Sequence, residues 1–189
     1  MKVVVIDDDP TGSQTVHSCL LLLRWDVEAL RRGLRHGSPL LFVLADTRSL
    51  TPDAAAQRNR EIVTNLEKAL AQEGFDRSEI QLVSRGDSTL RGHGVLEPAV
   101  LESCFGPFAA TFHVPAFLEG GRTTVNGVHL LHGEPVHSTP FAKDRLFGFS
   151  TSDLPHWLEQ KSAGAIAAAD VVKVSLEDLD QALTGGMPH

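Results

Sequence analysis

The sequence predicts an α/β fold: a three-layer, mostly parallel sheet with helices on both faces and a β-hairpin excursion around residues 119–137. Two observations favour this class. Short apolar segments alternate along the chain with longer segments of helical spacing, the order expected of β-α-β units. Three of the apolar segments also end in polar and charged residues, as strands do where a parallel sheet faces a ligand.

The first strand is expected over Val3–Ile6, directly before three consecutive carboxylates. Carboxylates at a strand end repel one another and lose hydration, so they suit a place where a cation, a hydroxylated ligand or a basic side chain is expected. A shaped turn follows, with one proline, one glycine and two hydroxyls: Pro10, Thr11, Gly12 and Ser13. The alternative is an Asx-Pro turn that only caps the next element.

Spacing and capping residues predict the remaining elements. Strands are expected at 19–23, 40–45, 80–83, 110–114 and 171–174. At 19–23 the leucines are also compatible with a helix. Helices are expected at 27–34 after Asp26, at 54–72 after Thr51 and Pro52, and at 95–104, 153–161 and 176–183. Residues 141–149 are expected to be irregular, and Asn-Gly and Gly-Glu turn signals predict the hairpin.

The composition is that of a soluble globular protein, with 42% apolar and 22% charged residues in a chain whose 189 residues suit one domain. The net charge of −7 includes no basic stripe, so binding to nucleic acid or to an anionic membrane is not expected. No apolar run reaches the length of a signal sequence or a membrane span. Cys19 and Cys104 are isolated, which favours reduced thiols and a cytoplasmic location.

Reactive side chains follow three of the predicted strands: Asp7, Asp8 and Asp9; Thr47, Arg48 and Ser49; Asp87, Ser88, Thr89 and Arg91. Because the carboxyl ends of parallel strands meet at one edge of a sheet, we expect these side chains to lie together. Arg91 can form a forked contact with a carboxylate or a phosphate. The alternative for Asp87 and Arg91 is an ordinary ion pair at the start of a helix.

Several other polar residues are candidates for binding roles. His93 can contact a ligand or cap a helix, and Arg122 can close over an anionic ligand or lie on the hairpin surface. His129, His132 and His137 belong to no recognised ligand pattern, so no metal site is expected. The chain also has no glycine-rich motif of a known nucleotide-binding type.

Four segments, in this order, resemble the four-carbon acid sugar kinase family: Asp8–Val16, Thr47–Leu50, Asp87–His93, and Pro115–Phe117 with Gly121–Thr123. The resemblance runs from Met1 to about Leu183. It implies the N-terminal substrate-binding domain of a kinase that phosphorylates acid sugars such as threonate or erythronate. ATP and Mg²⁺ are then expected with a C-terminal nucleotide-binding domain that is absent from this chain. Residues 1–189 would form a single, incomplete domain that is inactive alone. Its expected partners are a sugar acid, the C-terminal domain of the full-length protein and a second copy of the chain in a homodimer.

The resemblance also implies roles for individual residues. Asp9 or Asp87 is expected to take the proton from the attacking hydroxyl, and the choice between them stays open. Arg91 is expected to bind the substrate carboxylate. The other residues expected to line the pocket are Asp8, Thr11, Gly12, Ser13, Arg48, Ser88, Thr89, His93 and Arg122. The Asp-Pro-Thr-Gly-Ser form of the first motif is typical of a divergent branch, so the exact substrate stays open.

Two other functions are compatible with the sequence. The strand before Asp7, Asp9 and Thr11 also fits the first motif of haloacid-dehalogenase-type phosphatases, with Asp7 as nucleophile and Asp9 as acid and base. That fold needs a lysine and a further acidic pair beyond later strands, and Lys143 with Asp144 is a poor substitute. The second alternative is a non-catalytic binding fragment.

Overall fold

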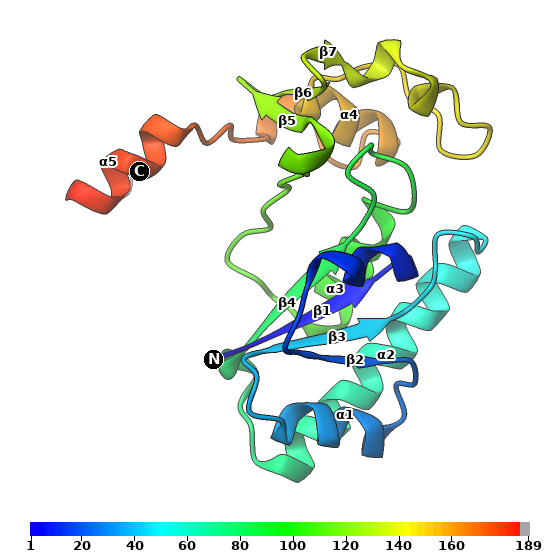
Figure 1. Cartoon of the computed structure of the whole chain (residues 1–189), viewed down its shortest axis with the longest axis vertical. Helices are drawn as coiled ribbons and strands as arrows, with labels where there is room; N and C mark the ends of the chain where they lie inside the picture. The colour runs from blue at the N-terminus through cyan, green and yellow to red at the C-terminus, as the bar shows by residue number, and fades with distance from the viewer. Residues whose placement is uncertain (186–189) are drawn as a thin grey trace. The chain divides into compact units, whose positions relative to one another are not determined.

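The computed structural model describes residues 1–185, and its contacts divide the chain into two compact units, Met1–His113 and a second that begins at Val114. In the first unit, a four-stranded parallel sheet has the order β2-β3-β1-β4 (Figure 1). The strands are β1 (Lys2–Asp7), β2 (Leu20–Leu22), β3 (Leu40–Leu44) and β4 (Ile80–Arg85). The predicted α/β class with a parallel sheet is confirmed.

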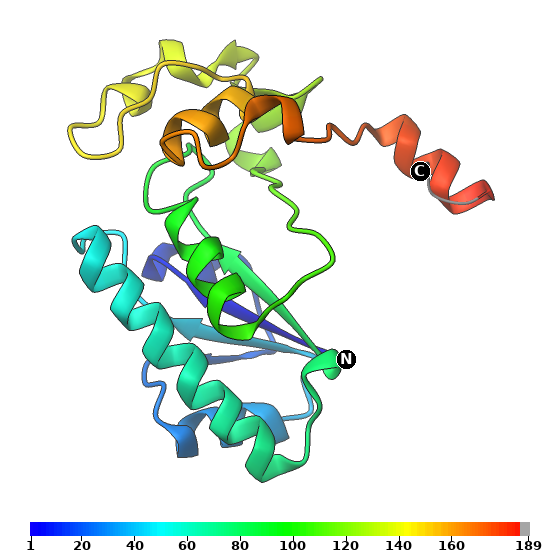
Figure 2. The same cartoon turned by 180° about the vertical axis from the view of Figure 1, so that it is seen from behind.

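Three helices pack together on one face of this sheet: α1 (Val27–Arg35), α2 (Pro52–Glu73) and α3 (Leu96–Phe105). The connections from β2 to β3 and from β3 to β4 run in the same direction along the strand order, so right-handed crossovers put their helices on the same face. Figures 1 and 2 show α2 and α3 on the same side of the strands. The connection from β1 to β2 runs the opposite way but holds a 3₁₀ turn, η1 (Pro10–Thr15). In this unit the helices expected on both faces are therefore found on one.

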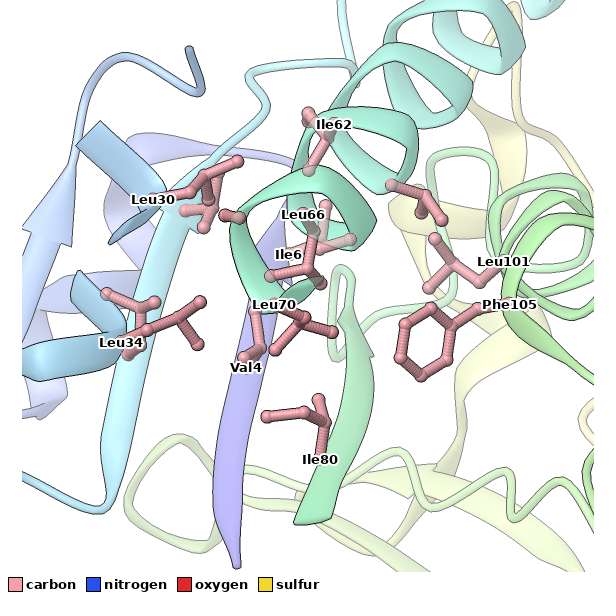
Figure 3. Close-up of a cluster of buried hydrophobic side chains, with 14 of the residues drawn as sticks. Val4, Ile6, Leu30, Leu34, Ile62, Leu66, Leu70, Ile80, Leu101 and Phe105 are labelled. Carbon is pink, nitrogen blue, oxygen red and sulfur yellow. The ribbon is translucent and has the colours of Figure 1, made fainter. Parts of the chain in front are cut away.

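The core of the first unit fills the space between the sheet and these helices (Figure 3). The side chains that meet there include Val4, Ile6, Leu30, Leu34, Ile62, Leu66, Leu70, Ile80, Leu101 and Phe105. α1 approaches β3 closely at Gly33, where a Cβ atom would lie 2.7 Å from the Leu41 methyl carbons. The buried ammonium of Lys2 donates to three carbonyls at the end of α1, including that of Leu34 at 2.7 Å. Lys2 thereby anchors the start of β1 to α1, and the polar residues follow the opposite end of the strand, at Asp7.

Capping residues set the helix ends as the sequence predicted. Asp26 accepts a hydrogen bond from the backbone of Ala29 at 3.0 Å and begins α1. Thr51 accepts one from Ala54 at 3.4 Å and begins α2, which ends at Gly74 in the left-handed conformation with φ of 74°. Within residues 1–185, no helix combines the length and the hydropathy that a membrane crossing requires.

The second unit contains the predicted hairpin. The strands β5 (Arg122–Val125), β6 (Val128–Leu131) and β7 (Glu134–Pro135) form an antiparallel sheet. Asn126 and Gly127 join β5 to β6 with φ angles of 52° and 81°, the positive values that a tight two-residue hairpin turn needs. Helices α4 (Leu154–Lys161) and α5 (Leu176–Gly185) follow, and both were predicted. The hairpin excursion is confirmed.

Two predicted strands do not form. Residues 110–114 and 171–174 have no strand assignment, and the second of these segments leads directly towards α5. Phe112, Val114, Val172 and Val174 are exposed in this chain. An apolar segment becomes a strand only when a neighbouring strand pairs with it, and neither segment is paired in either sheet of the described residues. Short 3₁₀ turns occupy η2 (Arg77–Glu79), η3 (Leu118–Gly120), η4 (Val136–Ser138), η5 (Pro140–Lys143) and η6 (Ala168–Asp170).

Candidate functional site

Backbone hydrogen bonds tie the ends of three strands together. The amide of Asp8, after β1, donates to the carbonyl of Arg85 in β4 at 3.1 Å. The carbonyl of Asp7 accepts from Ala45 after β3 at 2.8 Å, and the amide of Arg48 donates to the carbonyl of Asp8 at 3.1 Å. The three polar segments predicted to share one edge of the sheet therefore lie side by side.

Asp8 and Arg48 form a two-pronged ion pair at this edge. Arg48 donates from Nε to Asp8 Oδ2 at 2.9 Å and from Nη2 to Asp8 Oδ1 at 2.7 Å. The Asp8 side chain is only 2% exposed, and burial raises its pKa against the opposing effect of Arg48. Burial alone would lower the pKa of Arg48, but its contacts with Asp8 outweigh burial and raise that pKa. Arg48 therefore stays charged, and its Nη1 also lies 3.2 Å from Asp9 Oδ2.

Asp7 lies beneath the η1 turn. Its side chain is fully buried, Oδ1 accepts from Arg85 Nη1 at 3.3 Å, and Oδ2 has no hydrogen-bond partner among the described residues. A Cβ atom on Gly12 would lie closer than 3.0 Å to both the Asp7 carboxylate and Arg85 Nη1. Burial raises the pKa of Asp7, although Arg85 opposes it. Gly12 is thus required for the turn to close over this acid.

Asp9 shapes the η1 turn with its own side chain. Its Oδ1 accepts hydrogen bonds from the backbone amide and the hydroxyl of Thr11, the former at 2.9 Å. Ser13 Oγ donates to the carbonyl of Pro10 at 3.2 Å. Burial raises the pKa of Asp9, but the Thr11 hydrogen bonds and the charge of Arg48 more than offset it, so the pKa is lowered. The two hydroxyls predicted to face a ligand therefore hold the turn together.

The Asp87 loop reaches the same place from β4. Asp87 accepts from the Thr89 amide at 3.2 Å, from the Thr89 hydroxyl, and from Arg91 Nε at 2.6 Å. Burial would raise the pKa of Asp87, but these hydrogen bonds together lower it. At Gly92, with φ of 93°, a Cβ atom would lie 3.0 Å from Asp8 Oδ2. Ser88 is half-buried within this loop.

We call the seven charged side chains gathered here the strand-end cluster: Asp7, Asp8, Asp9, Arg48, Arg85, Asp87 and Arg91. Of these, sequence reasoning missed Arg85, which ends β4 and pairs with Asp7. The signal was available, because Arg85 follows the same predicted strand as the Asp87 loop. The cluster combines carboxylates, which accept hydrogen bonds from hydroxyls, with arginines, which bind carboxylates in a forked geometry.

His93 has a partner outside the cluster. It is mostly buried, and its Nε2 donates to the carbonyl of Leu50 at 3.0 Å. Its own carbonyl accepts from the amide of Glu97 at 3.0 Å, so His93 lies in the loop that leads into α3. This geometry matches the helix-start alternative for His93 more closely than direct ligand contact.

Glu97 is a second residue that sequence reasoning missed. It is 4% exposed and accepts hydrogen bonds from the hydroxyl of Thr47 and, at 3.4 Å, from Asn59 Nδ2. Burial raises its pKa to about 7, against these hydrogen bonds. An acid in the first turn of a helix is ordinarily explained by the helix dipole. Its spacing from Val100 and Leu101, which are also buried, was the signal that Glu97 faces inward.

Arg122 belongs to the second unit. Its guanidinium lies over the ring of Phe117, 5.3 Å from the centroid, and near that of Phe141, at 6.0 Å. Its backbone pairs with Phe117 and with Leu131 of β6. The strand-end cluster is thus formed by residues of the first unit, whereas Arg122 stacks among aromatic rings of the second.

Comparison with known proteins gives one curated relative and several solved structures. The relative is a D-erythronate kinase of Heliobacterium modesticaldum, 28% identical over 151 residues that cover 76% of this chain and 32% of that protein. A domain of unknown function from Bordetella bronchiseptica, solved as a domain-swapped dimer with bound citrate, has a TM-score of 0.66 and 25% identity, covering 88% of this chain and 47% of that one. This chain therefore spans about a third of the kinase and under half of the solved protein.

A putative tRNA synthase from Salmonella typhimurium shares the fold alone, with a TM-score of 0.58 and 16% identity over 96% of this chain and 42% of that one. The chain also matches the family described as the sugar-binding N-terminal domain, over residues 3–186. Because this match spans nearly the whole sequence, the chain belongs to the sugar-binding N-terminal domain family, which confirms its resemblance to the N-terminal domain of four-carbon acid sugar kinases.

Proposed function

We propose that this chain binds a four-carbon acid sugar, similar to threonate or erythronate, as the substrate-binding domain of an ATP-dependent kinase. The strand-end cluster is the observation that carries the proposal, because it joins acceptors for sugar hydroxyls to arginines suited to a carboxylate. The similarity to a D-erythronate kinase supports the substrate class. The citrate bound by the Bordetella protein is also a hydroxylated acid, which supports an acid ligand.

Within this proposal, Arg91 binds the substrate carboxylate and Asp9 or Asp87 receives the proton of the attacking hydroxyl. Both acids have a lowered pKa, so both are ionised at neutral pH and can accept a hydrogen bond from that hydroxyl. A positioned base contributes about 10²- to 10⁴-fold to a rate. Ser88, Thr89 and the η1 turn would complete the pocket.

We propose that ATP and Mg²⁺ bind to a separate C-terminal nucleotide-binding domain of the kinase. Residues 1–185 contain no group of three His, Cys, Asp or Glu side chains placed to hold a metal ion. The acids of the strand-end cluster contact arginines and hydroxyls of the same chain. We propose that residues 1–189, which the family match spans almost completely, form the N-terminal part of the kinase and do not catalyse phosphorylation alone.

The phosphatase alternative is not favoured. A nucleophilic aspartate must reach the phosphorus atom of its substrate, whereas Asp7 is fully buried beneath Gly12. Lys143, the candidate for the lysine that this alternative needs, lies in the second unit at the end of the short turn η5 and does not follow a strand of the parallel sheet. A binding fragment without activity of its own remains compatible with the proposal, since it describes the isolated chain.

Replacing Arg91 with lysine is expected to weaken the binding of a four-carbon sugar acid about tenfold to a hundredfold, because a forked, charge-assisted contact worth about 1.5–3 kcal/mol is lost. Isothermal titration calorimetry measures this change. Arg32→Lys, on the exposed face of α1, is the matched control and should bind like the wild type. Unchanged affinity in Arg91→Lys would remove Arg91 from the binding site.

We also propose a homodimer. Leu176, Leu179 and Leu183 recur at helical spacing along α5 and are all exposed, and the Bordetella relative is a domain-swapped dimer. Light scattering should give twice the mass of one chain, and Leu176→Glu combined with Leu183→Glu should halve it. Leu146→Glu, at an equally exposed leucine outside α5, should leave the dimer intact. A wild-type mass of one chain would contradict this proposal.

A further inference from the structure

A buried polar contact behind the strand-end cluster is not used by the proposed function. Glu97 of α3 accepts from the hydroxyl of Thr47 and from Asn59 of α2, and all three side chains are buried. Asn59 is itself positioned by a hydrogen bond from Nδ2 to the carbonyl of Ala55 at 3.0 Å. Buried polar groups are costly unless they are paired, so the hydrogen bonds of Thr47 Oγ1 and Asn59 Nδ2 to Glu97 favour one fixed conformation, although Asn59 Oδ1 has no partner among the described residues.

Glu97 in the first turn of α3 and His93 in the loop before it together hold both ends of the Thr47–Leu50 turn. At one end Glu97 accepts a hydrogen bond from the hydroxyl of Thr47, and at the other His93 Nε2 donates one to the carbonyl of Leu50 at 3.0 Å. The amide of Leu50 also donates to the carbonyl of Thr47 at 2.9 Å, which closes the turn. Arg48 is the residue that this turn presents to the acids after β1.

Arg48 needs such support because its side chain is long and can adopt many rotamers. It makes its two-pronged contact with Asp8 and also reaches Asp9. A shift of the turn would move the guanidinium away from both acids. Glu97 is also close enough to Asp8 and Arg48 for their charges to act on it in opposite directions.

We propose that Glu97 is a positioning residue that holds the Thr47 hydroxyl, so that Arg48 stays on Asp8 and Asp9 and the strand-end cluster keeps its geometry for the acid ligand. The role in ligand binding rests on the proposed function. The positioning of Arg48 does not depend on the proposed function, because it concerns contacts within the chain.

The test uses Thr47→Val, which keeps the shape of the side chain and removes only the hydroxyl, with Thr47→Ser as the matched control that retains it. The exchange rate of the Arg48 Nε–H proton, measured by NMR, shows how firmly the Arg48 guanidinium is positioned on Asp8. Titration with erythronate and threonate measures ligand binding. In Thr47→Val, the Arg48 Nε–H proton should exchange about tenfold faster than in the wild type. The variant should also bind the sugar acids about tenfold more weakly, as expected when a hydrogen bond to a charged group is lost. Thr47→Ser should stay within about twofold of the wild type on both measures.

Glu97→Gln provides a second, independent variant. The amide oxygen can still accept from Thr47 and Asn59, so Arg48 exchange should match the wild type at neutral pH. The raised pKa of Glu97 predicts an inflection near neutral pH in the binding profile of the wild type, and Glu97→Gln should lack it because its amide does not titrate.

The outcomes separate the two proposals. Wild-type exchange and affinity in Thr47→Val would overturn the positioning role of Glu97 while leaving a sugar-acid site in place. If the wild type binds neither acid, the proposed function fails. Arg48 exchange would then still decide the role of Glu97, with faster exchange in Thr47→Val supporting it and wild-type exchange overturning it.

Discussion

Replacing Arg48 with methionine is expected to lower the free energy of unfolding at neutral pH by about 3–5 kcal/mol, the cost of leaving one charge of a buried pair uncompensated. Asp8 is 2% exposed and both of its oxygens accept from Arg48, so the aspartate has little access to water. Urea denaturation of wild type and variant measures the difference, provided that the dependence on urea concentration is the same in both.

Arg24→Met is the matched control for Arg48→Met. Arg24 pairs with Asp26 on the surface, where its side chain is 83% exposed, and such a pair contributes about 0–1 kcal/mol. The double variant Arg48→Met with Asp8→Leu should recover much of the lost stability, because the buried Asp8 carboxylate is no longer left without its arginine, yet it should still bind sugar acids poorly. A loss below about 1 kcal/mol in Arg48→Met would contradict the buried pair that we describe.

Stability should fall as pH rises through the range in which Glu97 titrates. Its pKa is 4.5 when the chain is unfolded and about 7 in the folded protein, so the folded state holds the extra proton between these values. The stabilising contribution is fully present below 4.5 and is lost as pH rises through about 7. A shift of this size corresponds to about 3 kcal/mol.

Glu97→Gln isolates this effect from the other acids, since it does not titrate. Between these two pH values the wild type should lose stability relative to Glu97→Gln, and above neutral pH the difference should become constant. Chemical denaturation across the pH range measures both profiles. Parallel profiles would show that Glu97 is not buried as described.

The elements that the sequence predicted correctly are those with local signals. The strand at Val3–Ile6 is marked by its composition, and the ends of α1 and α2 are marked by Asp26, Thr51 and Gly74. Residues 110–114 and 171–174 have a similar composition but form no strand, because strand formation depends on a pairing neighbour that local sequence does not identify. The face to which each helix packs is likewise set by strand order, which is a property of the whole chain.

In the candidate site, the meeting of three strand ends was predictable, but the pairing within it was not. Local sequence puts Asp87 near Arg91, and this pair forms. The partner of Asp8 is Arg48, forty residues away, and only the register of the sheet brings them together. Glu97 shows the same limit, because its burial depends on how α3 packs against its neighbours.

The measurement that tests the central claim most directly is calorimetric titration of the whole chain with a panel of four-carbon sugar acids, and separately with ATP and Mg²⁺. We expect at least one sugar acid to bind, and we expect ATP with Mg²⁺ to give no binding heat because its site is assigned to a separate domain. Binding of ATP with Mg²⁺, or the absence of binding by every sugar acid, would contradict the account.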